Sequence, residues 1–403
     1  MKLCGIIAEF NPFTNGHSYI INKAKQQTGL DVLCLMSGNL VQRGELSIID
    51  KYQRATTAIK EGASFVMELP TRFALSSAQN FAEGAIKTLI DLNCISHLAF
   101  GIKLKNINDL KKLAYIKANE PKIIKEKFKQ YTKLGLSYSV AMFKIYNELF
   151  PEYRETLDAI QKEPNNILAL EYLAAIYKFN ANIEPVFIER TDNGYNSLIP
   201  KIIKVNDKPL YYASASKIRS LMLQNRKFSK YIPKSSHNDF INLANLTSAS
   251  ISQKLECLLI NSIRNKSYQE LEQYQDYNNN LAHLIKDTCT SSGTIDEIIR
   301  ITDSKCYRPK RIKKLLIYPY LNLTKEAYVS AEENNYLTVL AVDKSKKSTL
   351  SKIAKLSNLK LIISHKDLIE LKNKNIVTLE QKNTDLYNLV HSFPSSTDIT
   401  KFI

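Results

Sequence analysis

The feature that most constrains this chain is a polar turn between a buried strand and a helix near its N-terminus. Residues 3–8 form the apolar run Leu-Cys-Gly-Ile-Ile-Ala, which is typical of a strand buried in a parallel sheet. The turn Glu9-Phe-Asn-Pro-Phe-Thr-Asn-Gly-His-Ser-Tyr19 follows directly, and the residues after it can form a helix. A strand, a turn with Gly and His, and a helix start together present N–H groups and an imidazole to a phosphate. The sequence therefore predicts an α/β protein with a phosphate site at this turn.

The rest of the first half repeats the alternation of strand and helix. Strands are predicted at 31–37, 64–69, 96–100 and 184–189, and helices at 50–61, at 77–91 and over most of 106–178. Asp50 can cap the first of these helices. This rhythm predicts a doubly wound parallel sheet that binds its ligands at the carboxyl ends of the strands.

The character of the sequence changes after about residue 225. Linker-like segments with Pro233 are followed by helical patterns at 251–265, 267–287, 294–302 and 308–317. Tyr336–Val342 and Leu359–Ser364 flank a Lys-rich helix and predict a small α/β unit. A chain of 403 residues can form two domains. We expect an α/β domain over 1–225 and a mostly helical, basic domain over 226–403 that contains the small unit.

The composition excludes several classes of protein. No stretch approaches the ~18 apolar residues of a membrane span, and the N-terminus lacks the pattern of a signal peptide. The six cysteines form no Cys-x-x-Cys pair, which argues against a zinc site or a disulfide framework. We expect a cytoplasmic protein with reduced thiols and no metal site built from its side chains.

The net charge of +17 favours a polyanionic partner, nucleic acid before a membrane surface. A proteome rich in Lys, Asn and Ile would give the same excess, so this alternative stays open. The most basic segment has six cations and no acid around Tyr307: Lys305, Arg308, Lys310, Arg311, Lys313 and Lys314. Such a segment is either a solvated helix face or a stripe that follows RNA phosphates, and we favour the second interpretation.

Two segments carry the strongest candidates for a nucleotide site. Gly16 lets the backbone approach a phosphate closely, and His17 at the helix start can donate to phosphate oxygens. Ser214 and Ser216 at a second helix start, with Arg219 one turn later, suit a triphosphate. Each segment alone is also compatible with an ordinary turn or helix cap.

Three further groups are weaker candidates. The loop after the second predicted strand contains Ser37, Gly38, Asn39 and Arg43, which either position a substrate or only shape the loop. Asn165 and Asn166 stand before a helix, where either could be an N-cap. Arg190 follows the fifth predicted strand and could instead balance a neighbouring carboxylate.

Several of these segments resemble known signatures. The turn is similar to the His-x-Gly-His signature of nucleotidylyl transferases and class I aminoacyl-tRNA synthetases, with Thr14 in place of the first His. Ser214–Arg219 resembles the second signature of the nucleotidylyl transferase superfamily, Ser/Thr-x-x-Ile-Arg. With Ser37-Gly-Asn39, Arg43-Gly-Glu45, Glu68-Leu-Pro70, Phe100-Gly101 and Pro164-Asn-Asn-Ile-Leu168, the first 220 residues resemble the tRNA(Met) cytidine acetate ligase family.

The resemblance implies a nucleotidylyl transferase-like (HUP) fold and a reaction in two steps. Acetate and ATP form acetyl-adenylate, and N4 of the wobble cytidine of elongator tRNA-Met then takes the acetyl group, with Mg²⁺ as the usual companion of ATP. Catalytic roles fall on His17, Arg219 and Thr14. ATP binding falls on Ile7, Ala8, Glu9, Phe10, Asn11, Pro12, Phe13, Thr14, Asn15, Gly16, His17, Ser18, Tyr19, Ile20, Gly101, Asn165 (favoured over Asn166), Arg190, Ser214 and Ser216.

Thr14 is the departure from the signature. A hydroxyl can donate one hydrogen bond but has no imidazole charge, and losing one transition-state donor costs about 10²–10³ in rate. We expect the protein to remain active. Two rivals stay open: a small-molecule nucleotidylyl transferase, against which the basic C-terminal extension argues, and a non-catalytic RNA-binding homologue.

Overall fold

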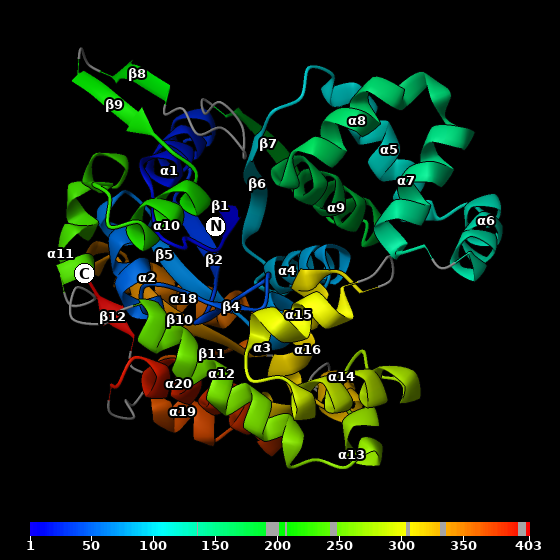
Figure 1. Cartoon of the computed structure of the whole chain (residues 1–403). Helices are drawn as coiled ribbons and strands as arrows, with labels where there is room; N and C mark the ends of the chain where they lie inside the picture. The colour runs from blue at the N-terminus through cyan, green and yellow to red at the C-terminus, as the bar shows by residue number, and fades with distance from the viewer. Residues whose placement is uncertain are drawn as a thin grey trace.

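A twisted sheet with helices on both faces forms the centre of the molecule (Figure 1). The computed structural model describes residues 1–134, 136–190, 201–205, 208–241, 248–303, 307–330, 336–393 and 400–403. Within these residues the main sheet has eight strands in the order β11-β10-β5-β2-β1-β6-β7, with β12 beside β10. Their bounds are β1 Leu3–Ala8, β2 Val32–Ser37, β5 Phe65–Leu69, β6 Ile95–Ile102, β7 Glu184–Glu189, β10 Tyr336–Val342, β11 Lys360–Ile362 and β12 Lys401–Phe402.

Both faces of the central strands are buried, which explains their continuous apolar runs. In β2, Leu33 and Leu35 pack with α4 (Ala78–Asp91), α5 (Ile107–Asn119) and α9 (Pro164–Lys178). Cys34 and Met36 point to the opposite face and pack with α1 (Asn15–Thr28) and α2 (Lys51–Lys60). The strands from β5 to β7 run parallel, so the predicted doubly wound sheet is confirmed.

Local signals set most element ends in the first half. Asp50 accepts a hydrogen bond from the N–H of Tyr52 and begins α2, and Ser77 caps α4 in the same way. Gly29 ends α1 with a φ of 67°, a conformation that favours glycine. One predicted boundary was wrong: β6 continues to Ile102, so Gly101 lies inside the strand instead of after it.

The helices that follow β6 include α5, α6 (Lys122–Lys133), α7 (Tyr138–Leu149), α8 (Arg154–Lys162) and α9, as the pattern predicted. A hairpin of β8 (Lys201–Val205) and β9 (Lys208–Tyr212) then leads to α10 (Ala215–Leu223). The sequence analysis did not predict this hairpin, which lies above α1 and α10 in Figure 1.

The second half supplies α11 (His237–Ile241), α12 (Ser248–Arg264), α13 (Tyr268–Glu272), α14 (Asn279–Ser291), α15 (Ile295–Thr302), α16 (Pro309–Leu321) and α17 (Lys325–Ser330). It continues with α18 (Lys347–Leu356), α19 (His365–Ile369) and α20 (Lys374–Val390). The predicted helix 267–287 is interrupted, since Asp276 has a positive φ of 64° between α13 and α14. No helix in the described part of the chain has the length and apolar character of a membrane span.

The strands of the small C-terminal unit join the main sheet. Strand β10 pairs antiparallel with β5, with Val342 opposite Phe65. Its side chains alternate between the two faces, Val339 on one and Leu340 on the other, so it covers the edge that β5 would otherwise expose. The α/β fold class is thus confirmed. The division into two domains near residue 225 stays a prediction, and strands from both sides of that boundary belong to the same sheet.

Candidate functional site

A cavity of about 440 Å³ lies at the carboxyl ends of β1 and β6. In the sheet, β2 and β5 lie on one side of β1, and β6 and β7 lie on the other. This is the point of a doubly wound sheet where strand order reverses and where ligands bind. Ala8 and Glu9 line the cavity after β1, Phe100 and Gly101 from β6, and Arg190 after β7.

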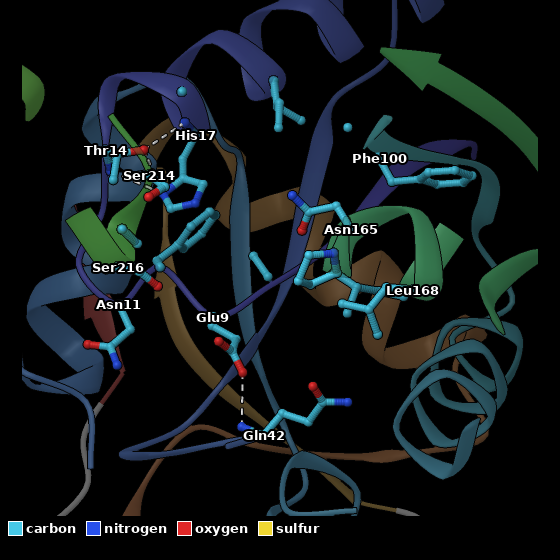
Figure 2. A pocket seen from close by; sticks show the side chains of 18 of the residues that line it. Glu9, Asn11, Thr14, His17, Gln42, Phe100, Asn165, Leu168, Ser214 and Ser216 are labelled. Carbon is cyan, nitrogen blue, oxygen red and sulfur yellow. Dashed lines mark hydrogen bonds between the residues drawn. The ribbon is translucent and has the colours of Figure 1, made fainter. Parts of the chain in front are cut away.

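Three helices begin at the cavity wall. Gly16 and His17 come from the start of α1, Pro164 and Asn165 from α9, and 214–216 from α10. Figure 2 shows His17, Ser214 and Ser216 on one side, across from Asn165 and Phe100. Each helix start carries a partial positive charge and N–H groups, so the three together favour a polyanion.

Thr14 and His17 form a reciprocal cap at the start of α1. The Thr14 hydroxyl accepts from the backbone N–H of His17 at 3.3 Å, and His17 Nδ1 accepts from the backbone N–H of Thr14 at 3.1 Å. Because Nδ1 accepts, the proton of the neutral ring is on Nε2. Thr14 therefore fixes the tautomer in which His17 can donate from Nε2.

The His17 ring is held neutral by its surroundings. Phe10 and Phe13 pack against it with centroid distances of 5.0 and 5.5 Å. Burial is the larger cause and the nearby Arg190 guanidinium the second, and together they lower the pKa of His17 to about 3. The ring is a neutral hydrogen-bond donor at physiological pH.

Two glycines keep the cavity open. A Cβ on Gly101 would lie 3.0 Å from Arg190 Cγ and 3.1 Å from Ile20 Cδ1, so this site admits no side chain without movement. A Cβ on Gly16 would meet only ordinary contacts, 3.4 Å to Thr14 Oγ1 and 3.9 Å to a Tyr212 ring carbon. The protein's own packing therefore does not require glycine at position 16. Glycine there instead leaves room for a ligand to approach the backbone.

Arg219 is anchored into the turn after β1. It donates to the carbonyl of Asn11 at 2.7 Å and to the Ser216 hydroxyl at 3.1 Å. Burial, followed by the positive charge of Arg219, lowers the pKa of Arg43. The two predicted signature segments are thus brought together, with a pair of guanidinium groups beside them.

Glu9 supplies a carboxylate to this positive site. Its Oε1 accepts from the backbone N–H of Gln42 at 2.9 Å, as Figure 2 shows. The described residues include no group of three or more His, Cys, Asp or Glu side chains that could hold a metal ion.

The opposite wall is apolar and was missed by the sequence analysis. It contains Ala78, Phe81, Phe100, Ile167, Leu168 and Tyr172. The rings of Phe100 and Tyr172 pack at 5.8 Å, and burial raises the pKa of Tyr172, which stays neutral. The available signals were Phe100-Gly101 in β6 and Pro164-Asn-Asn-Ile-Leu168 at the start of α9, whereas α4 gave none.

Most of the predicted residues line the cavity. They are Ile7, Ala8, Glu9, Phe10, Asn11, Thr14, Gly16, His17, Tyr19, Ile20, Arg43, Gly101, Asn165, Arg190, Ser214, Ser216 and Arg219. Additional lining residues include Gln42, next to Arg43, and Tyr212, just before Ser214.

Four residues of the turn do not line it: Pro12, Phe13, Asn15 and Ser18. Phe13 is in the core, with 2% of its surface exposed. Asn15 donates to the carbonyls of Tyr211 and Lys230, and Ser18 donates to the Glu61 carboxylate at 2.7 Å. Their polar groups position neighbouring segments, which explains why they point away from the cavity.

Ser37, Gly38 and Asn39 also lie outside the cavity lining. Arg54, which is 1% exposed, donates to the carbonyls of Ser37 at 3.1 Å and Gly38 at 2.6 Å. Asn39 accepts from the backbone N–H of Lys51 at 2.9 Å. The two carbonyls and Asn39 Oδ1 are thus used within the protein, although Ser37 Oγ and Asn39 Nδ2 are buried without a hydrogen-bond partner among the described residues. Arg43, at the end of the same loop, does line the cavity.

The structure separates the two asparagines at the start of α9. Asn165 lines the cavity, as the sequence analysis favoured. Asn166 is fully buried and bonds both backbone groups of Lys103 and the carbonyl of Ala159. Asn166 therefore holds the loop after β6.

The basic segment divides into parts. Lys305 lies outside the described residues. Lys310 and Lys314 line the cavity, Lys313 pairs with Glu45 at 2.8 Å, and Arg308 and Arg311 are exposed and outside the lining. The assignment of all six residues to RNA is untested, but two of them lie beside the candidate nucleotide site.

Sheet order, the cavity at its switch point and the two signature segments define the nucleotidylyl transferase class. The sequence matches the profile of the HIGH Nucleotidyl Transferase family over residues 1–401. Proteins named tRNA(Met) cytidine acetate ligase are similar over nearly the whole length. That of Thermoanaerobacter sp. (strain X514) is 32% identical, covering 97% of this chain and 96% of the relative. That of Clostridium perfringens (strain ATCC 13124) is 31% identical with the same coverage.

The chain belongs to the tRNA(Met) cytidine acetate ligase family. The crystal structure of Thermotoga maritima TmcAL (apo, form I) shares its fold, with a TM-score of 0.85 at 23% identity over 97% of this chain and 95% of that one. The form of that protein bound with alpha-thio ATP gives a TM-score of 0.83 at the same identity and coverage.

Proposed function

We propose that this protein activates acetate with ATP and transfers the acetyl group to N4 of the wobble cytidine of elongator tRNA-Met. A carboxylate oxygen of acetate attacks the α-phosphorus and pyrophosphate leaves. The N4 amine then attacks the acetyl carbon, AMP leaves and the amine loses a proton. The observation that carries the proposal is the convergence of three helix starts, His17 and Arg219 on one cavity. Family membership supports the choice of acetate and tRNA.

The roles of the residues follow from their places in the cavity. His17, Ser214, Ser216 and Arg219 bind the triphosphate, since they supply donors and positive charge at two helix starts. The part of ATP other than the triphosphate is bound by Gly101 in β6, Asn165 at the start of α9 and Arg190 directly after β7. The reaction needs stabilised charge more than a covalent nucleophile, because negative charge develops on the pyrophosphate as it leaves.

Thr14 takes part through His17. Its hydroxyl and N–H cap the helix and keep Nε2 protonated, which supports an active enzyme despite the missing first histidine. In the protein without ligand, the pKa of the His17 ring is about 3, so the ring is neutral and Nε2–H is available to donate to a phosphate oxygen.

Mg²⁺ is proposed as a companion of ATP. Its ligands would be chiefly phosphate oxygens, as is usual for this ion, and Glu9 is the cavity carboxylate placed to add one more oxygen. The ion would neutralise part of the phosphate charge.

The net charge and the exposed Arg308 and Arg311 support tRNA as the second substrate. Chemistry on a base requires that the base leave its stack, so the cytidine would enter from the open side of the cavity.

The test is ATP–pyrophosphate exchange with labelled pyrophosphate. We expect exchange that depends on acetate, and a His17→Ala variant that folds but exchanges slowly. Exchange that depends on a phosphomonoester would favour the small-molecule nucleotidylyl transferase. A folded protein that shows no exchange with acetate and none with a phosphomonoester would favour the non-catalytic RNA-binding homologue.

A further inference from the structure

Helix α16 brings two lysines from the second half of the chain to the cavity. Lys310 and Lys314 both line it, and their spacing of four residues places them on one side of the helix. Arg308, two positions before Lys310, and Arg311, one position after it, do not line the cavity. Only the cations on the side of α16 that faces the cavity line it, so the basic segment does not act as one unit.

The position of α16 is fixed by close contacts with the loop after β2 and by a hydrogen bond to Ser76, just before α4. A Cβ on Gly44, which has a φ of +71°, would lie 2.8 Å from the backbone nitrogen of Lys314. Lys313 Nζ pairs with Glu45 at 2.8 Å, and Lys314 Nζ donates to the carbonyl of Ser76 at 2.6 Å. The helix therefore packs on the same loop that contributes Gln42 and Arg43 to the cavity.

The lysines add to a group of like charges. Lys310 and Lys314 lie with Arg43 and Arg219 among the lining residues, with Glu9 as a balancing carboxylate. Partial burial, followed by Arg43, lowers the pKa of Lys310, which stays exposed at the cavity. Lys314 is less exposed, and burial lowers its pKa to about 8. Desolvation and mutual repulsion make it unfavourable to hold several cations in one cavity. A bound polyanion offsets this cost.

We propose that Lys310 and Lys314 bind the β- and γ-phosphates of ATP and remain on the leaving pyrophosphate. This inference rests on the proposed function. It reassigns two cations of the basic segment from RNA to ATP and leaves Arg308 and Arg311 on the side that could contact tRNA. A helix distant in sequence from both signatures would then complete the triphosphate site.

The experiment compares the affinities of ATP and AMP by calorimetry for the full-length protein and its Lys310→Gln, Lys314→Gln and double variants. One charge-assisted hydrogen bond contributes about 1.5–3 kcal/mol, so each substitution should weaken ATP binding about tenfold or more. AMP lacks both terminal phosphates, and its affinity should change less than about twofold. Lys314→Arg should restore much of the ATP affinity, because it keeps the charge.

Arg311→Gln is the matched control on the same helix. It should keep the ATP affinity and weaken tRNA binding, with a salt slope shallower by about one. Equal losses of ATP and AMP affinity would overturn the inference, since they indicate a structural effect. It would also be overturned if the lysine variants lost tRNA affinity and kept ATP affinity. In both cases wild-type ATP binding leaves the proposed function intact; a wild type that binds no ATP would defeat that function itself.

Discussion

Two loops follow neighbouring parallel strands: the turn after β1 was predicted to bind a phosphate, and the loop after β2 was a weaker candidate that could either position a substrate or only shape the loop. The turn after β1, residues 9–19, places Glu9, Phe10, Asn11, Thr14, Gly16, His17 and Tyr19 in the cavity wall. The loop after β2, residues 37–45, places only Gln42 and Arg43 there. The strands pair in register up to Ala8 and Met36, so both loops start at the same edge of the sheet.

The difference lies in which polar groups the protein itself uses. Arg54 on α2 donates to the carbonyls of Ser37 and Gly38, and also to that of Glu9. It draws the start of the second loop inward while holding the base of the first turn in place. A position at the ligand edge of a sheet is therefore insufficient for a binding role, because a buried donor can occupy the loop's polar groups first.

The largest expected effect comes from Arg54→Met, which tests what holds the two loops. Four carbonyls would lose their charged donor at about 1–3 kcal/mol each, so the free energy of unfolding should fall by about 4 kcal/mol or more. Denaturant unfolding measures it. Lys60→Met, at an exposed position on the same helix, is the control and should change stability by less than about 0.5 kcal/mol. A loss for Arg54→Met no larger than that of the control would contradict the account.

His17→Ala should lower the rate of acetate-dependent exchange by about 10²–10³, the usual loss for one preorganised donor. His17→Gln is the companion variant. Gln at this position can still accept from the Thr14 N–H and complete the cap, so its stability should stay near that of the wild type. A full rate in both variants would show that the turn holds no catalytic donor.

Gly16→Ala should weaken ATP binding about tenfold while leaving the fold intact. The new methyl group meets only ordinary contacts within the protein, and Ala in a helix is favoured over Gly by about 0.5–1 kcal/mol. Calorimetry with ATP and thermal unfolding are the two measurements. Unchanged ATP affinity would mean that no phosphate approaches this backbone.

Asn39→Ala is the corresponding change in the second loop. It removes an acceptor for the Lys51 N–H, which should cost about 1 kcal/mol of stability, as for a lost helix cap. ATP affinity should change less than about twofold. A selective loss of ATP affinity would restore a direct ligand role for this loop and remove the contrast between the two.

The smallest effect is on pH dependence. The pKa of His17 falls from its ordinary value near 6.5 to about 3 on folding, so the unfolded chain binds a proton that the folded protein does not. Stability should therefore fall as the pH is lowered below about 6.5, by less than about 1 kcal/mol between pH 7 and 6. Unfolding curves of the wild type and His17→Gln should differ in this slope. Identical slopes would show that the ring titrates normally.

The turn, its strand and its helix were predictable because their signals are contiguous. An apolar run, a Gly-His pair and a capping Thr14 fix a strand, a helix start and a donor within seventeen residues of the chain start. The preference for Asn165 over Asn166 comes from the family resemblance and not from the local sequence, in which either could be an N-cap; Asn165 lines the cavity.

What the sequence did not reveal depends on contacts between distant residues. Arg54 resembles any arginine on an amphipathic helix, and only the packed structure shows that it is 1% exposed and bonded to three loops. Lys310 and Lys314 come nearly three hundred residues after the turn that they face. The pairing of β10 with β5 similarly joins segments that no local pattern connects.

The central claim is that this cavity supports acetylation of cytidine with acetate and ATP. The most direct measurement is mass spectrometry of nucleosides from tRNA-Met incubated with the protein, ATP and carbon-13 acetate. We expect labelled N4-acetylcytidine that requires ATP and whose yield falls strongly with His17→Ala. The absence of labelled N4-acetylcytidine, from folded protein that binds both ATP and tRNA-Met, would contradict it.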